Sequence, residues 1–143
     1  MIKNIILAIV FITSSVYATE INWAKDYDSG VAQAKKAKKP IVFIISRDTC
    51  KFCVMLDNKT LKDEKVAKAL NKNFIAIRSW TNKGDYIPSD LARYTPGLPG
   101  IWFLFSDGKP MFKPVLGYME KDRFLEALGI IYTEFKKQNK GTK

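Results

Sequence analysis

Two cysteines three positions apart, Cys50 and Cys53, are the only cysteines of this 143-residue chain. They follow the most apolar strand candidate of the sequence, residues 41–45, after a short loop, and open a segment of helical character. At the start of a helix, two such cysteines can close a disulfide within one turn, and the backbone N–H groups there point toward the first sulfur. A thiolate at Cys50 would be stabilised in that position. The stretch is therefore a candidate redox site.

Structural and metal-binding roles fit the pair less well. A disulfide across so short a ring offers only about 2 kcal/mol through loop closure, which argues against a purely structural bond. Two thiolates are half of a tetrahedral zinc site, and the sequence has no histidine or third cysteine to complete it. A c-type haem needs a histidine directly after the second cysteine, where Val54 stands. We expect no metal and no cofactor beyond a reversible Cys50–Cys53 disulfide.

The first 18 residues have the layout of a secretory signal peptide. Lys3 supplies the positive end, residues 5–12 are apolar, and Val16-Tyr17-Ala18 is a small-residue cleavage site. The apolar run is too short for a membrane anchor, which needs about 20 residues. We expect cleavage after Ala18 and a mature domain over residues 19–143. Export would place the dithiol where disulfides persist, either outside the cell or in a bacterial periplasm, and we expect the periplasm.

The composition is that of one globular domain, with 47% hydrophobic and 27% charged residues. The formal charge of +10 invites a nucleic-acid hypothesis. The lysines, however, gather in residues 35–39 and 136–143, where expected helices end and where cations complement the helix dipole. We therefore interpret them as solvated helix ends and expect no nucleic-acid partner. Steering toward acidic partners or anionic lipid headgroups is the lesser alternative.

Hydrophobic periodicity and turn residues predict an α/β domain with a central mixed sheet flanked by helices. A βαβ unit with a parallel crossover comes first, and an antiparallel pair follows. The first half is expected to contain a helix from Asp26 or Asp28 to the lysines before Pro40, a strand at 41–45, a helix from the cysteines to Leu56, a break at 58–62, a helix capped by Asp63, and a strand at 74–77. A loop at 79–87 and a short helix at 88–94 should follow, and then a strand at 101–105, a turn at Asp107-Gly108 and an edge strand at 111–116. The last expected helix runs through Phe124, Leu128, Ile131 and Phe135, and its tail frays from Lys136.

Taken together, these features resemble the thioredoxin fold family. The features are a CxxC that opens a helix after a buried strand, Gly97-Leu98-Pro99 before a later apolar strand, and Asp107-Gly108 before a final amphipathic helix. The resemblance covers residues 26–135. Within the family, the chain is similar to exported thioredoxin-like domains such as the C-terminal domain of the thiol-disulfide interchange protein DsbD. The similar segments are residues 39–42, 65–70 and 97–99.

The resemblance implies roles for matching residues. Cys50 would be the nucleophile that attacks a partner disulfide, and Cys53 the resolving thiol that releases the mixed disulfide. Pro99 would be the cis-proline that faces the dithiol, and the Leu98 backbone would pair with the substrate chain. The residues that flank the cysteines complete the expected substrate-binding surface: Thr49, Lys51 and Phe52.

The sequence departs from the family pattern beside the dithiol. Ile44 stands where the family commonly has a buried carboxylate that assists proton transfer at the resolving thiol, so proton transfer must use water or another group. Thr49 replaces the usual tryptophan before the first cysteine, which predicts a different choice of partner. Lys51, inside the motif, should favour a Cys50 thiolate by a few tenths to about 1 kcal/mol.

We expect a periplasmic thiol-disulfide oxidoreductase, most plausibly a monomeric reductase of exported proteins that takes electrons from a membrane donor of the DsbD type. A net oxidase is the alternative within this class, motivated by Lys51 and the missing carboxylate. An isomerase usually needs a dimerisation segment, which the sequence lacks. From another class, the chain could be a non-catalytic thioredoxin scaffold that binds a client beside Pro99.

Overall fold

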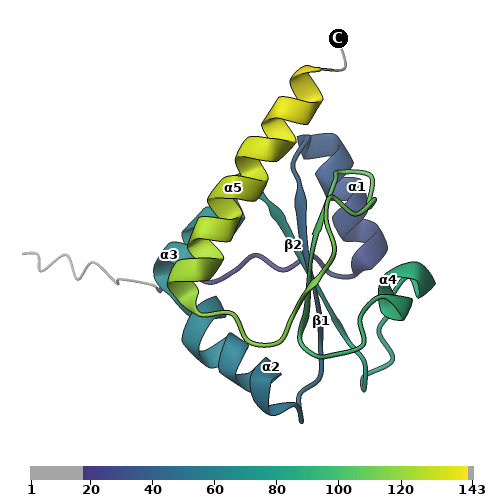
Figure 1. The fold of residues 1–143 in the computed structure, drawn as a ribbon, viewed down its shortest axis with the longest axis vertical. Helices are drawn as coiled ribbons and strands as arrows, with labels where there is room; N and C mark the ends of the chain where they lie inside the picture. The colour runs from purple at the N-terminus through teal and green to yellow at the C-terminus, as the bar shows by residue number, and fades with distance from the viewer. Residues whose placement is uncertain (1–17, 142–143) are drawn as a thin grey trace, which may run out of the picture.

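The computed structural model describes residues 18–141 of the chain (Figure 1). The predicted signal peptide falls almost wholly outside these residues, because Ala18 is the first of them. In chain order the elements are α1 (Tyr27–Ala37), β1 (Ile41–Ser46), α2 (Lys51–Leu56), the π-helix η1 (Asp57–Leu61), α3 (Glu64–Asn73), β2 (Ile75–Trp80), α4 (Ser89–Arg93), β3 (Gly100–Leu104), β4 (Val115–Leu116) and α5 (Lys121–Lys140).

The four strands form one mixed sheet in the order β2-β1-β3-β4. The central strand β1 pairs parallel with β2 and antiparallel with β3, and β3 pairs antiparallel with β4. All six residues of β1 are buried, as its uninterrupted apolar sequence predicts for a strand covered on both faces. The cysteines therefore follow the carboxyl end of a strand in the middle of the sheet.

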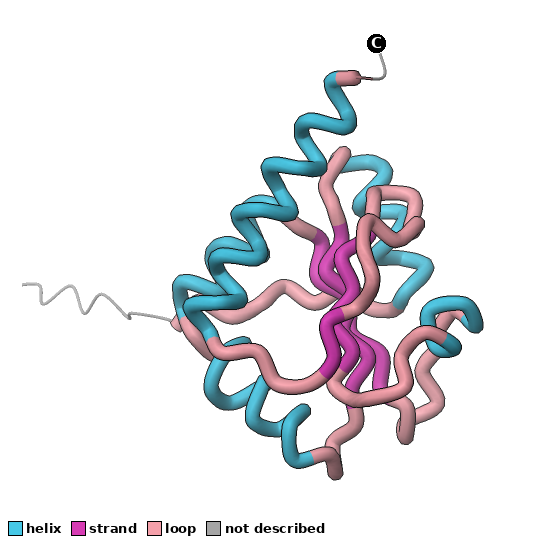
Figure 2. The backbone as a smooth tube through the Cα atoms, in the orientation of Figure 1, coloured by secondary structure: helices cyan, strands magenta, loops and turns pink. Residues whose placement is uncertain are grey.

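Helices cover both faces of the sheet (Figures 1 and 2). In this nearly edge-on view, α2, α3 and α5 lie on one side and α1 and α4 on the other. The core on the α2/α3/α5 side includes Val42, Ile44, Leu56, Val66, Leu70, Ile101, Phe124 and Leu128. The core on the α1/α4 side includes Ala34, Ile41, Phe43, Ile77, Leu91, Trp102 and Leu104. The alternation of β1 side chains between the two cores is the period-two pattern of a strand.

Helix α1 begins at the predicted cap and lies close against the sheet. Asp26 accepts a hydrogen bond from the Ser29 amide at 2.8 Å, and Ser29 returns one to the Asp26 backbone, which makes a capping box. Gly30 is buried where α1 meets β2, and a Cβ atom there would overlap the side chain of Ile77. The absence of a side chain at this position permits the close approach.

The expected break at 58–62 is wrong. Residues 57–61 continue α2 as a π-helix, and the Asp57 amide donates to the carbonyls of Cys53 and Val54. The sequence suggested a break because these residues are mostly polar. Thr60, however, is fully buried and donates a hydrogen bond of 2.7 Å to the Met119 carbonyl at the start of α5.

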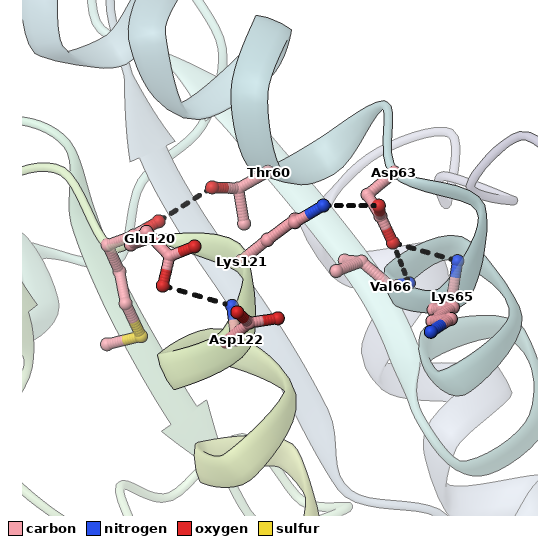
Figure 3. A network of polar contacts seen from close by, with 8 residues as sticks. Thr60, Asp63, Lys65, Val66, Glu120, Lys121 and Asp122 are labelled. Atoms are coloured by element: carbon pink, nitrogen blue, oxygen red, sulfur yellow. Dashed lines mark hydrogen bonds and ion pairs between the residues drawn. The ribbon is translucent and has the colours of Figure 1, made fainter.

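The junction between η1 and α3 is tied to the start of α5 by further polar contacts (Figure 3). Asp63 accepts hydrogen bonds from the amides of Lys65 and Val66, which confirms its predicted role as the cap of α3. The Lys121 ammonium lies 3.6 Å from the same carboxylate. These contacts join the helical run behind the cysteines to the last helix.

Three other predicted boundaries are corrected. Strand β2 runs on to Trp80, into the expected loop, because its last residues pair in register with the end of β1. The edge strand predicted at 111–116 is reduced to β4 and an isolated bridge between Leu104 and Pro110, since neither Pro110 nor Pro114 has an N–H to donate. The tail expected to fray from Lys136 is helical to Lys140. Among residues 18–141, no helix is both long and apolar enough to cross a membrane.

Candidate active site

The cysteine pair lies at the carboxyl end of the central strand, where residues 47–50 connect β1 to α2. The Arg47 side chain donates to Thr81 at 3.1 Å, and Lys83 lies 3.6 Å from Asp48, so this loop is held to the segment that follows β2. Cys50 is the N-cap of α2, with extended backbone angles. Its sulfur accepts a hydrogen bond from the Cys53 amide at 3.4 Å. The predicted placement of the pair at a helix start is therefore observed.

The two thiols, both free, differ in their access to solvent. Cys50 is half-buried, whereas Cys53 is 1% exposed. Burial raises the pKa of the Cys53 thiol, and its hydrogen bond with Cys50 acts in the same direction. Contacts with the Ser46 side chain and the Arg47 backbone oppose this rise. Cys53 thus keeps its proton in a covered position, and Cys50 is the sulfur that a partner can reach.

The loop before β3 faces the first cysteine. The Leu98–Pro99 peptide bond is cis, and the Cys50 thiol lies 3.7 Å from the Leu98 carbonyl oxygen, to which it donates. The Pro99 carbonyl accepts from the Gly117 amide at 2.8 Å, which links the loop to the end of β4. The structure brings Cys50, Cys53 and Leu98 together at one end of the sheet.

Thr95 anchors this loop from behind, on the α4 side of the sheet. Its hydroxyl donates to the Leu91 carbonyl at 2.6 Å and accepts from the Trp102 indole at 2.9 Å. Its methyl group lies so near Gly100 that a Cβ atom at that glycine would overlap it. These contacts fix the loop between α4 and β3, so the peptide bond opposite Cys50 has a defined position.

The other predicted binding residues lie beside Cys50 on the surface. Thr49, Lys51 and Phe52 are all exposed, and the Phe52 ring is 51% accessible. Val54, on the same helix, adds a further exposed apolar side chain. The surface next to the reactive sulfur is thus partly apolar and includes one cation, and the roles of these residues in binding remain predictions.

Sequence reasoning assigned no role to the charged residues that the fold places behind the dithiol. Ile44 is buried in the apolar core, as expected from its type, and its register partner on β2 is Arg78. The Arg78 guanidinium lies 3.2 Å from the Asp57 carboxylate. The sequence does show Arg78 as a single cation at the end of an apolar strand, which could have marked it as unusual. Its neighbours in the fold could not be predicted from the sequence.

Metal chemistry has no evident site among residues 18–141, because no cluster of three or more histidine, cysteine, aspartate or glutamate side chains forms there. Thioredoxin-like oxidoreductases work through a cysteine pair without a cofactor.

Comparison with known proteins agrees with this site. A profile of the thioredoxin-like family matches residues 22–106, more than half of the chain. The chain belongs to the thioredoxin-like family. It is 31% identical, over 119 residues and 81% of its length, to the thiol:disulfide interchange protein DsbD of Vibrio vulnificus. Because the match spans only 20% of that relative, it concerns one part of a much longer protein.

Solved structures confirm the fold predicted from the sequence. The C-terminal domain of Neisseria meningitidis DsbD, in its oxidised form, superposes with a TM-score of 0.56 at 27% identity and covers 72% of this chain and 90% of that domain. A thioredoxin from Thermus thermophilus gives 0.65 at 20% identity, covering 78% and 87%. The oxidoreductase DsbH gives 0.67 at 15% identity, covering 85% and 90%. The last two matches bear on the fold alone.

Proposed function

We propose that this chain is a periplasmic thiol-disulfide oxidoreductase that reduces disulfides of exported proteins. One observation carries the proposal: a reachable Cys50 and a buried Cys53 share a hydrogen bond at a helix start, opposite the Leu98 carbonyl. The family and the likeness to DsbD support the same chemistry. A signal peptide cleaved after Ala18 would deliver the domain to its compartment.

The reaction moves two electrons in two exchanges. The Cys50 thiolate attacks one sulfur of a partner disulfide, that S–S bond breaks, and the partner's other sulfur leaves as a thiolate. The Cys53 thiol then loses its proton to solvent, and its thiolate attacks the Cys50 sulfur. The mixed disulfide breaks, the Cys50–Cys53 disulfide forms, and the partner leaves with both sulfurs reduced. A membrane dithiol donor of the DsbD type would return two electrons to the domain.

The expected binding surface follows from the same geometry. The Leu98 backbone beside Pro99 would pair with the partner chain, and Thr49, Lys51 and Phe52 would contact it around Cys50. The domain would act as a monomer on protein thiols and disulfides, with no nucleic acid involved.

Cysteine substitutions test the proposal against a role in binding alone. With a disulfide-bonded test protein and purified domain, we expect Cys50→Ser to abolish reduction and Cys53→Ser to accumulate a mixed disulfide through Cys50, detected by mass spectrometry after acid quenching. Retained function in the Cys50→Ser protein would favour a non-catalytic scaffold that binds clients beside Pro99. If the parent protein reduces no partner disulfide and Cys53→Ser traps no adduct with one, the redox proposal is contradicted.

A net oxidase of exported proteins is the second candidate. The observation that favours it is cationic charge on either side of the dithiol: Lys51 lies within the motif, and the partly buried Arg78 responds to the negative charge of a Cys53 thiolate. Cations stabilise thiolates and so favour the reduced pair, which makes its disulfide a stronger oxidant. The reduction potential of the pair separates the two directions.

A further inference from the structure

Arg78 is a partly buried cation on the face of the sheet that the dithiol helix covers. It lies on β2 beside Ile44 of β1, and the residue two positions before it, Ala76, contributes to the core on that same face. Its side chain is 16% exposed. Arg78 also lines a surface pocket with Trp23 and Asp57, and the part of its charge that is withdrawn from water needs compensation by neighbouring groups. The groups around it should therefore have a defined purpose.

One carboxylate and two indole rings hold the guanidinium. Asp57 lies 3.2 Å away, while the Trp23 and Trp80 rings stack on the cation with centroids at 4.1 and 5.0 Å. The Nε atom of Arg78 is nevertheless buried without a hydrogen-bond partner, the one such side-chain nitrogen or oxygen among residues 18–141. Asp57 and the rings thus fix the position of the cation without using all of its donors.

This arrangement is connected to the resolving cysteine through the helical run that carries both Cys53 and Asp57. Asp57 comes one helical turn after Cys53, and its amide donates to the Cys53 carbonyl. Burial lowers the pKa of Arg78, and the negative charges of Asp57 and of a Cys53 thiolate both oppose that decrease. Arg78 and a Cys53 thiolate therefore attract one another across the interior.

We propose that Arg78, positioned by Asp57, is the group that promotes loss of the Cys53 proton when the mixed disulfide is resolved. This inference rests on the proposed function and adds a residue that acts through Cys53. A buried carboxylate, which Ile44 replaces, would have to accept a proton. A fixed guanidinium instead stabilises the thiolate, and the proton passes to solvent.

Two other charged side chains, Glu20 and Lys62, line the same surface pocket as Arg78 and Asp57. Cys50 is hydrogen-bonded to Cys53 from the start of the helix, and Lys62 acts on Asp57 in the direction that lowers the pKa of that carboxyl. Burial outweighs this effect and raises the pKa of Asp57. A Cys53 thiolate acts on the charge of Arg78, which makes Arg78 the cation to remove in a test. Its removal and the removal of Asp57 should have opposite effects on the thiol.

The experiment compares Arg78→Met, Arg78→Lys and Asp57→Asn. Ionisation of Cys53 is followed by the ultraviolet absorbance of the thiolate in Cys50→Ser proteins. The resolution rate is followed in proteins with both cysteines, by release of the second thionitrobenzoate after mixing with Ellman's reagent. We expect Arg78→Met to move Cys53 ionisation to higher pH and Asp57→Asn to move it to lower pH, while Arg78→Lys stays near the parent protein.

The expected rate change is smaller than the change in thiolate fraction. A tenfold smaller fraction slows resolution only about threefold, because the more basic thiolate is the better nucleophile. Arg93→Met and Asp90→Asn, on exposed positions of α4, carry the same charge changes away from the dithiol and should alter neither ionisation nor rate.

Opposite shifts of Cys53 ionisation in Arg78→Met and Asp57→Asn would support the inference. If breaking the ion pair acted only by loosening the fold, the two variants would shift Cys53 ionisation in the same direction. Shifts in the same direction, or none, would overturn it. If Arg78→Met does not fold, an unchanged Cys53 ionisation in Asp57→Asn still overturns it. Failure of the proposed function would appear separately: the parent protein would not exchange disulfides, although substitutions at Arg78 and Asp57 would still shift Cys53 ionisation.

Discussion

The two cysteines carry the same thiol in two environments, and their proposed roles as nucleophile and resolving thiol rest on that difference. Cys50 caps a helix within reach of a partner, whereas Cys53 is covered by the core and keeps its proton. The order of events in an exchange reaction follows from this asymmetry: attack from outside comes first, and resolution from inside comes second.

The buried thiol predicts a pH dependence of stability. The pKa of Cys53 is raised by folding from its ordinary value of 9.0, so above that pH the folded protein binds more protons than the unfolded one. The free energy of unfolding of the reduced protein should therefore fall as pH rises through and beyond 9.0, by at most about 1.4 kcal/mol per pH unit.

Urea unfolding of the reduced protein and of reduced Cys53→Ala across this range provides the measurement. Tyr27, whose pKa is raised by burial, contributes to both proteins, so the difference in slope isolates Cys53. Equal slopes for the two proteins would show that folding does not hold the thiol proton.

At this scale the sequence was informative where chemistry depends on neighbours along the chain. The spacing of Cys50 and Cys53 was enough to locate the dithiol, and Gly97-Leu98-Pro99 located the facing loop. The Asp57–Arg78 pair could not be found in this way, because its partners are 21 positions apart and meet only where η1 packs against the face of the sheet that carries Arg78.

At the scale of elements, close packing between α1 and β2 depends on the missing side chain of Gly30. A methyl group there would overlap Ile77, which is fully buried, so a displacement of α1 or a strained Ile77 would follow. Gly129 is also helical, but it lies exposed in α5 with nothing within 4 Å of an added Cβ atom.

These two glycines form a matched pair for substitution. We expect Gly30→Ala to destabilise the protein by about 1–3 kcal/mol through overpacking. Gly129→Ala should stabilise it by about 0.5–1 kcal/mol, because alanine has the higher helix propensity. Chemical denaturation of both variants beside the parent protein measures the two changes. A Gly30→Ala protein as stable as Gly129→Ala would contradict the close contact.

Element types were predictable from periodicity, but several boundaries depend on tertiary contacts. Residues 57–61 are polar enough to suggest a break, yet Thr60 is buried by its bond to the Met119 carbonyl, and the helix continues. Trp80 is strand because it pairs with Ser46, and Phe135 packs beside Phe105 with ring centroids 6.4 Å apart, in a helix that continues to Lys140. None of these contacts is local in sequence.

At the scale of the whole molecule, the fold places the reactive pair, the facing loop and the buried ion pair around the carboxyl end of one central strand. The thioredoxin fold was predictable because the motif, the Gly-x-Pro and the final helix occur in the order that this topology requires. The direction of electron flow was not predictable in this way, because it depends on the relative free energies of the dithiol and the disulfide.

The equilibrium reduction potential of the Cys50–Cys53 pair, measured against glutathione redox buffers with alkylation and mass spectrometry, tests the central claim most directly. A reductase of exported proteins should have a potential near the roughly −270 mV of thioredoxin. A value near the roughly −120 mV of DsbA would contradict the proposed direction and favour the oxidase. No reversible disulfide at any potential would contradict the oxidoreductase itself.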